Sequence, residues 1–222
     1  MAAVILKDGS RREYPQPVTP LAVAQELSQR LAAEAVVAKV NGVLWDLNRE
    51  MPAEAELELL DFENPEARNV YRHSTAHLMA QAVRQLYPGV RLAIGPAIED
   101  GFYYDFDLDK TFTPEDLVKI QARMAELARA NQQIERRVLS RDKALALFRE
   151  QGEDYKVELI EALPEDAEIS LYQQGDFVDL CAGPHVGSTG RLKAFKLTSV
   201  AGAYWRGDEH QPMLQRIYGT SF

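Results

Sequence analysis

The chain has a single cysteine among its 222 residues, so it cannot form an internal disulfide. A reducing, cytoplasmic setting is therefore expected. No apolar run reaches the roughly 18 residues of a membrane-spanning helix, and residues 1–7 predict a short strand rather than a signal peptide. The sequence thus predicts no membrane partner. Its formal net charge is −9, which argues against non-specific binding to nucleic acid.

Motifs for nucleotide chemistry are also missing. The sequence contains no Walker loop, no G-x-G-x-x-G after a predicted strand, no Asp-Asp metal pair and no G-x-S-x-G elbow. Neither the spacing of a zinc finger nor the His-Glu-x-x-His of a zinc protease is found. The chemistry that remains is hydrolysis or proton transfer on a substrate brought from elsewhere.

Histidine and cysteine are few but clustered. The chain has four histidines and one cysteine, and four of these five residues lie in two short motifs. His73 and His77 form H-S-T-A-H, which on a helix places both imidazoles on one face. Cys181 and His185 form C-A-G-P-H, a loop that can fold over them. Three imidazoles and a thiol suit tetrahedral zinc by type, but such a site can also relay protons or activate water, and the spacing does not decide.

Three further side chains are candidates for the same site. Asp179 precedes Cys181 by two residues, so both are expected on one face of a strand, where the carboxylate can orient an imidazole. Lys156, on a strand predicted over residues 155–160, can supply positive charge to an oxyanion or a phosphate. Tyr104 follows a tight turn and can wall a pocket. Surface charge and core packing are the simpler interpretations of the lysine and the tyrosine.

Residues 1–61 predict a small α+β domain. A hairpin signal at Asp8-Gly9 is followed by a helix start at Thr19-Pro20, and a second hairpin signal lies at Asn41-Gly42. Residues 56–60 alternate between glutamate and leucine, which predicts a final strand. This order is typical of a ubiquitin-like β-grasp. The segment has no His and no Cys, so binding or positioning is its expected role.

Residues 62–222 predict a larger α+β domain. Asn64-Pro65 starts a long helix to about Tyr87 that carries both histidines of the first motif. Further helices are expected from Pro114 to about Ala130 and from Ser140 to about Glu150. Strands are expected at residues 92–106, 133–139, 155–160, 171–180, 194–197, 203–206 and 214–218.

Seven strings are spread along the chain: H-S-T-A-H at 73–77, A-I-G-P at 93–96, E-D-G-F-Y-Y-D at 99–105, D-L-C-A-G-P-H at 179–185, F-K-L at 195–197, A-G-A-Y-W-R-G-D at 201–208 and M-L-Q-R-I-Y-G-T at 213–220. With these strings the sequence resembles the N-terminal portion of the bacterial threonyl-tRNA synthetases over essentially its whole length. The resemblance implies a TGS (β-grasp) domain at 1–61 and an editing domain at 62–222, related to alanyl-tRNA editing proteins. The aminoacylation core and the anticodon-binding domain of that family are absent.

This resemblance implies post-transfer editing. Serine is threonine without a methyl group, which a binding pocket discriminates by only about 1–3 kcal/mol. A second site therefore hydrolyses mischarged Ser-tRNA(Thr) to serine and free tRNA while sparing Thr-tRNA(Thr). The alternative is a non-catalytic module that binds the tRNA acceptor arm. Residues 191–222 give this alternative slight support, because they contain five basic residues and only two acidic ones.

The resemblance also assigns roles to the candidate residues. It places His73, Lys156, His77, Cys181 and His185 in the catalytic site, with His73 and Lys156 nearest the ester. Asp179, which would meet the substrate amino group, and Tyr104 are substrate-binding residues.

No metal is required for editing in this interpretation, although alanyl relatives bind zinc through a similar quartet. The four His and Cys residues of the two motifs are the ligands if zinc is bound. ATP, Mg and Zn are expected only for the missing core, and the parent enzyme is expected to be a homodimer.

Overall fold

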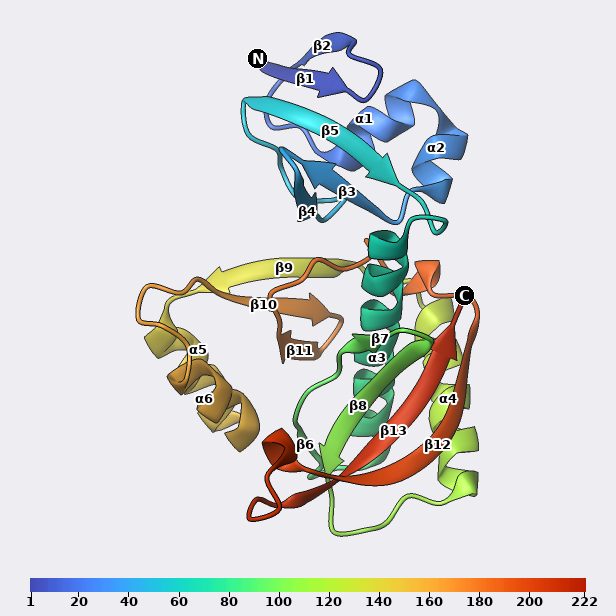
Figure 1. Cartoon of the computed structure of the whole chain (residues 1–222), viewed down its shortest axis with the longest axis vertical. Helices are drawn as coiled ribbons and strands as arrows, with labels where there is room; N and C mark the ends of the chain where they lie inside the picture. Colours follow the sequence, from blue (N-terminus) through green and yellow to red (C-terminus); the bar gives the residue numbers. More distant parts are fainter. The chain divides into compact units, whose positions relative to one another are not determined.

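The computed structural model describes residues 1–222, which form two compact units (Figure 1). The first unit comprises Met1–Tyr71 and Gly183–Gly187, and the second comprises Arg72–Ala182 and Ser188–Phe222. Helices and sheets both occur, as the expected α+β class requires. The division at residues 61 and 62 stays a prediction. None of the helices is both long enough and apolar enough to cross a membrane.

The first unit is built on a five-stranded sheet in the order β2-β1-β5-β3-β4. β1 and β5 pair parallel, whereas the other neighbours are antiparallel, which is the arrangement of a β-grasp. The apolar sides of the sheet and helices share one buried core. The elements are β1 (Ala2–Leu6), β2 (Arg11–Tyr14), α1 (Pro20–Leu27), α2 (Gln29–Glu34), β3 (Val37–Val40), β4 (Val43–Trp45) and β5 (Glu54–Leu60).

Ser28 divides the first helical segment, which the sequence pattern predicts as one helix. Its backbone is extended, with φ −170° and ψ 132°, so α1 ends there. The Ser28 side chain then accepts hydrogen bonds from the N–H groups of Arg30 and Leu31 and caps α2. Serine favours this position because its hydroxyl satisfies backbone donors at a helix start. Apolar residues keep their helical spacing on both sides of Ser28, so the sequence pattern does not indicate the break.

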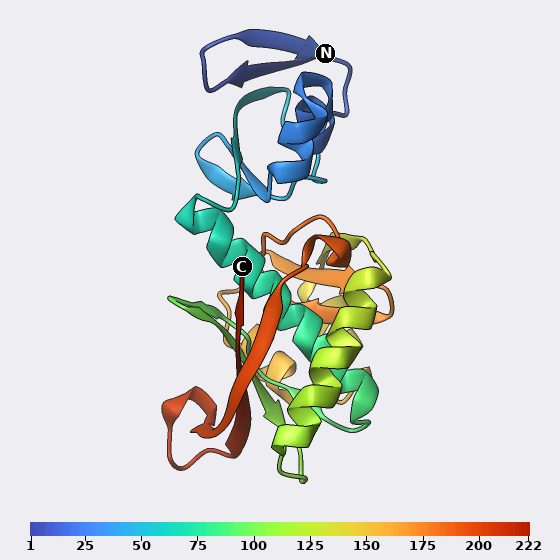
Figure 2. The same cartoon turned by 90° about the vertical axis from the view of Figure 1, so that its right-hand side faces the viewer.

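A long helix, α3 (Pro65–Leu86), carries the first histidine motif. Its bounds agree closely with the expected helix. In the second unit, α3 and α4 lie against one face of a sheet in the order β12-β13-β8-β6, with β7 beside β8 (Figure 2). The bounds are β6 (Arg91–Leu92), β7 (Ala97–Ile98), β8 (Gly101–Asp107), α4 (Pro114–Arg129), β12 (Phe195–Tyr204) and β13 (Met213–Ser221).

The alternation of side chains along β8 directs its aromatic residues into the core. Phe102, Tyr104 and Phe106 are fully buried, because every second side chain of a strand points to the same face. One of the strands that pair with β8 is β13, more than a hundred residues later, with Ile217 opposite Tyr104. The two C-terminal strands are longer than the short segments expected there, since they form one antiparallel ladder.

A smaller sheet, in the order β11-β10-β9, completes the second unit. Two helices, α5 and α6, share an apolar cluster with β10, in which Phe148, Ile160 and Leu171 are buried. A single strand is expected over residues 171–180, but the structure has a hairpin there. Gly175 turns the chain, with a positive φ of 59°. The bounds are β9 (Ile134–Leu139), α5 (Arg141–Glu150), α6 (Asp154–Glu161), β10 (Ile169–Gln174) and β11 (Phe177–Leu180).

Lys156 lies on helix α6, so the prediction of a strand over residues 155–160 is wrong. A short apolar run does not distinguish a strand from a buried helix. Lysine, glutamate and leucine favour helices, and the segment Asp154–Glu161 is rich in them. The structure nevertheless buries Lys156, whose side chain is 3% exposed.

Candidate active site

His73 lies in the middle of α3, where both of its ring nitrogens have close neighbours. Nδ1 is 2.9 Å from the carbonyl oxygen of Gly95, and Nε2 is 3.0 Å from Sγ of Cys181. Burial lowers the pKa of the His73 imidazole below its ordinary value. A carbonyl can only accept, so a neutral ring carries its proton on Nδ1. Nε2 is then an acceptor that faces the Cys181 thiol.

His77 follows one helical turn later, on the same face of α3. The two imidazole centroids are 4.7 Å apart, in an edge-to-face arrangement. Burial lowers the pKa of His77 well below its ordinary range, with smaller contributions from His73 and Lys156. Its Nδ1 lies 3.5 Å from Oδ2 of Asp179. The i, i+4 spacing thus gives two neighbouring imidazoles that stay neutral at physiological pH.

Asp179, Lys156 and Tyr104 form a buried polar group. Lys156 Nζ donates to the hydroxyl of Tyr104 at 2.9 Å, and this hydroxyl donates to Asp179 Oδ2 at 2.6 Å. The ammonium also lies 2.6 Å from Asp179 Oδ1, though without the alignment of a hydrogen bond. A buried charge is costly unless it is paired, and here the two charges neutralise each other.

The ring of Tyr104 completes this group from strand β8. Its side chain is fully buried, and burial raises the pKa of its hydroxyl well above the ordinary value, as does the adjacent Asp179 carboxylate. The phenol therefore stays protonated and donates to Asp179. Lys156 Nζ also donates to the carbonyl oxygen of Ala93 at 2.7 Å. Three residues from separate elements are thereby held in one place.

Cys181 directly follows β11. Its N–H donates to the carbonyl oxygen of Ser170 at 3.1 Å, and the Ser170 hydroxyl donates to the Cys181 carbonyl at 2.6 Å. These two bonds continue the β10–β11 hairpin by one residue and fix the thiol. His73, His77 and Cys181 each offer a ligand atom, and these atoms lie within 4.8 Å of one another.

His185 lies in the Gly183–Gly187 segment of the first unit, after a cis Gly183-Pro184 bond. Its side chain is buried, and its N–H donates to a carboxylate oxygen of Asp46 at 2.8 Å. Gly187 is held in the same unit, where its carbonyl accepts from the Asn48 amide at 3.2 Å. The membership of His185 in the site stays a prediction.

The donor types fit a zinc ion. Two imidazoles and a thiol are within a few ångströms of one another, and nitrogen and sulfur are the ligands zinc prefers. His73 also has the outer hydrogen bond, from Nδ1 to a backbone carbonyl, that orients histidine ligands. The same arrangement suits a water molecule held by neutral imidazoles beside an ammonium.

Two backbone groups of the site have no side-chain signature in the sequence. They are the carbonyl oxygens of Gly95 and Ala93, which accept from His73 and Lys156. The segment that carries them joins β6 to β7 and passes against Tyr104. A Cβ at Gly95 would lie 2.1 Å from the Tyr104 ring. Only glycine fits this close approach, so the A-I-G-P string is the one sequence signal that marks it.

Comparison with known proteins finds two family models in the chain. Residues 2–61 match the TGS domain, and residues 169–218 match the threonyl and alanyl tRNA synthetase second additional domain. The chain is 60% identical over 222 residues to a threonine–tRNA ligase of Syntrophomonas wolfei and 59% identical over 211 residues to one of Carboxydothermus hydrogenoformans. These alignments cover 100% and 95% of this chain but 35% and 33% of the relatives. The chain therefore spans about a third of the length of the curated relatives it matches.

Proposed function

We infer that this chain, which matches the N-terminal part of the threonine–tRNA ligases over its whole length, is their editing portion. The reaction that we propose is hydrolysis of mischarged Ser-tRNA(Thr) to serine and free tRNA, with Thr-tRNA(Thr) spared. The observation that carries the proposal is the contact between His73 Nε2 and Cys181 Sγ, at 3.0 Å, beside the buried Lys156–Asp179 pair. Ester hydrolysis needs these kinds of group: a proton acceptor and a cation at the developing oxyanion.

Within this proposal, His73 and Lys156 act nearest the ester. Nε2 of His73 accepts a proton from the attacking water or passes one to the leaving ribose oxygen. The Lys156 ammonium stabilises negative charge on the ester oxygen. His77, Cys181 and His185 hold water and shape the pocket. His185 is four residues from Cys181, so a short loop joins the two.

Asp179 and Tyr104 recognise the substrate in this account. The Asp179 carboxylate meets the amino group of the seryl ester, which is a cation of complementary charge. The Tyr104 hydroxyl fixes the orientation of that carboxylate through their 2.6 Å hydrogen bond. The substrate ammonium would then share Asp179 with Lys156.

We propose that the reaction requires no metal. The protein supplies its own cation in Lys156, whose Nζ is within 2.9 Å of Tyr104 and Asp179. If zinc were bound, its ligands would come from His73, His77, Cys181 and His185, and with three of them as ligands the ion would lower the pKa of a bound water to about 7. ATP, Mg and Zn belong to the aminoacylation core of the longer enzyme.

The partners follow from the same proposal. The acceptor end of tRNA(Thr) brings the ester, and serine leaves as the product. A homodimeric parent enzyme and a cytoplasmic location, where tRNA is charged, belong to this proposal too.

Release of labelled serine from Ser-tRNA(Thr) tests the proposal against the acceptor-arm-binding alternative. A hydrolase releases serine many times faster than the spontaneous rate. A module that only binds the acceptor arm protects the ester and slows its loss. Protection without release would overturn the proposed activity.

A further inference from the structure

Glu153 carries a buried carboxylate that none of the roles above uses. It occupies the N-cap position of α6, yet its side chain makes no capping hydrogen bond there. The side chain is 3% exposed. Burial raises the pKa of this carboxyl, although the Leu92 N–H and the positive charge of Arg84 oppose the shift. Burying a carboxylate costs free energy unless other groups stabilise it. The burial of Glu153 therefore requires an explanation.

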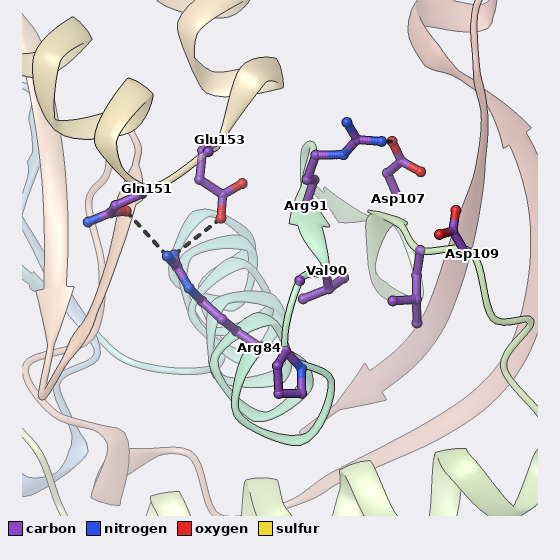
Figure 3. A pocket seen from close by; sticks show the side chains of 11 residues that line it. Arg84, Val90, Arg91, Asp107, Asp109, Gln151 and Glu153 are labelled. Carbon is purple, nitrogen blue, oxygen red and sulfur yellow. Dashed lines mark hydrogen bonds and ion pairs between the residues drawn. The ribbon is translucent and has the colours of Figure 1, made fainter.

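The carboxylate of Glu153 bridges two other elements, and Figure 3 shows its ion pair with Arg84. Oε2 accepts from the N–H of Leu92, in β6, at 2.9 Å. Oε1 lies 3.2 Å from Nη1 of Arg84, near the end of α3. The Arg84 guanidinium also donates to Gln151 at 3.5 Å. These side chains line a cleft of about 660 Å³ in the second unit.

Two of the hydrogen bonds that Glu153 makes with backbone groups lead to Lys156. The carbonyl oxygen of Glu153 accepts the N–H of Lys156 at 3.0 Å, in the first turn of α6. The carboxylate holds Leu92, which adjoins Ala93, and the Ala93 carbonyl accepts from Lys156 Nζ at 2.7 Å. Glu153 thus holds both the backbone of Lys156 and the segment whose Ala93 carbonyl accepts from the Lys156 ammonium.

We propose that Glu153 is a positioning residue for Lys156, held in place by Arg84. This inference rests on the proposed editing function, in which Lys156 acts at the ester. Glu153 does not touch the substrate. It sets the distance between α6 and the 92–93 backbone, so that the Lys156 ammonium stays beside Tyr104 and Asp179. Without this bridge, α6 and β6 shift apart and the ammonium leaves its place.

The test compares Glu153→Ala and Glu153→Gln with Asp154→Asn in the full chain. Glutamine retains an acceptor for the Leu92 N–H, whereas alanine removes it. Asp154 is the matched control, because its carboxylate is the next one along the chain, is 77% exposed and touches only Arg91 at 3.7 Å. Thermal unfolding of each variant shows whether it is folded.

We expect Glu153→Ala to lower kcat for Ser-tRNA(Thr) by about 10-fold to 10²-fold with KM unchanged, since a small misplacement of a catalytic group has effects of this size. Glu153→Gln should recover most of the rate, and Asp154→Asn should match the parent chain. A folded Glu153→Ala chain with the parental kcat, or one in which only KM changes, overturns the proposal.

A second readout does not depend on activity. Acetic anhydride labels accessible lysines, and mass spectrometry measures the labelling of Lys156. Its labelling rate should rise in folded Glu153→Ala, because loss of the bridge exposes the buried ammonium, and should stay parental in Asp154→Asn. If Glu153→Ala is unfolded, Arg84→Met replaces it and should raise the labelling rate above that of Asp154→Asn. Parental labelling overturns the positioning role, whereas failure of the parent chain to release serine overturns only the proposed function.

Discussion

At the scale of single residues, the site depends on which nitrogen of His73 carries the proton. The Gly95 carbonyl requires a proton on Nδ1, so Nε2 faces the Cys181 thiol as an acceptor. Burial lowers the pKa of His73 and His77, which keeps both rings neutral. A neutral imidazole can accept a proton from water, whereas an imidazolium cannot.

Replacing His73 by alanine should lower deacylation of Ser-tRNA(Thr) by about 10²–10⁴-fold, the usual effect of losing a general base or proton carrier. The change removes only a partly buried side chain, so the thermal midpoint should change little. Single-turnover deacylation measures the effect. His210→Ala is the control, because His210 is exposed and lies in neither histidine motif. A His73→Ala chain with the parental rate would refute the role of this residue.

Stability should fall when the pH drops below about 6.5. Burial holds the pKa of His77 well below its ordinary value of 6.5. The unfolded chain therefore takes up a proton near pH 6.5 while the folded chain does not, and protonation favours unfolding. The expected loss is about 1.4 kcal/mol per pH unit for this imidazole. Urea unfolding between pH 7 and 5.5 measures it.

The His77→Gln variant separates this contribution from that of the carboxylates. Its free energy of unfolding should decline less with falling pH than that of the parent chain. Identical slopes for the parent and His77→Gln would contradict the buried, neutral state of His77.

Metal dependence separates the two chemical interpretations of the imidazoles and thiol. We expect deacylation to persist after treatment with a strong chelator and elemental analysis to find no tightly held zinc. The reason is that Lys156 already supplies a cation beside the site. One zinc per chain, removable only with loss of activity and restored by added zinc, would show that the metal-free proposal is wrong.

At the scale of elements, the part of the site that lies on a long helix with regular apolar spacing could be predicted from the sequence. The helix that carries His73 and His77 follows from Asn64-Pro65 and its apolar spacing, and its bounds agree with α3. The helix of Lys156 could not be predicted, because the polar and apolar residues over 155–160 fit both the period of a helix and that of a strand. Pairing of β8 with β13 joins segments over a hundred residues apart, which no local pattern encodes. The carbonyls of Ala93 and Gly95 are backbone groups, so only the glycine of the A-I-G-P string marks their segment in the sequence.

Substitution of Gly95 by alanine should disturb the segment between β6 and β7. The added Cβ would lie 2.1 Å from the ring of Tyr104, which is fully buried and has no room to move. Overpacking of this kind costs about 1–3 kcal/mol. The Gly95 carbonyl should shift from His73, so deacylation should fall together with the thermal midpoint.

Gly202→Ala is the matched control for this change. Its Cβ would meet only the flexible end of Met213, at 3.2 Å, so stability and activity should stay near the parental values. A Gly95→Ala chain that is equally stable and active would show that the contact with Tyr104 does not constrain this segment.

At the scale of the whole molecule, the buried polar group of the candidate site lies in one of the two units. All the Lys156, Asp179 and Tyr104 contacts lie in the second unit. The first unit is a β-grasp with a TGS match over residues 2–61, and its Gly183–Gly187 segment contains His185. We propose that the first unit positions the tRNA while the second unit hydrolyses the ester.

The most direct test of this account is the ratio of two single-turnover rates, for Ser-tRNA(Thr) and Thr-tRNA(Thr), with the chain in excess. We expect rapid loss of the seryl ester, whereas the threonyl ester should decay near its spontaneous rate. Equal rates for the two esters, or no loss of the seryl ester above the spontaneous rate, would contradict it.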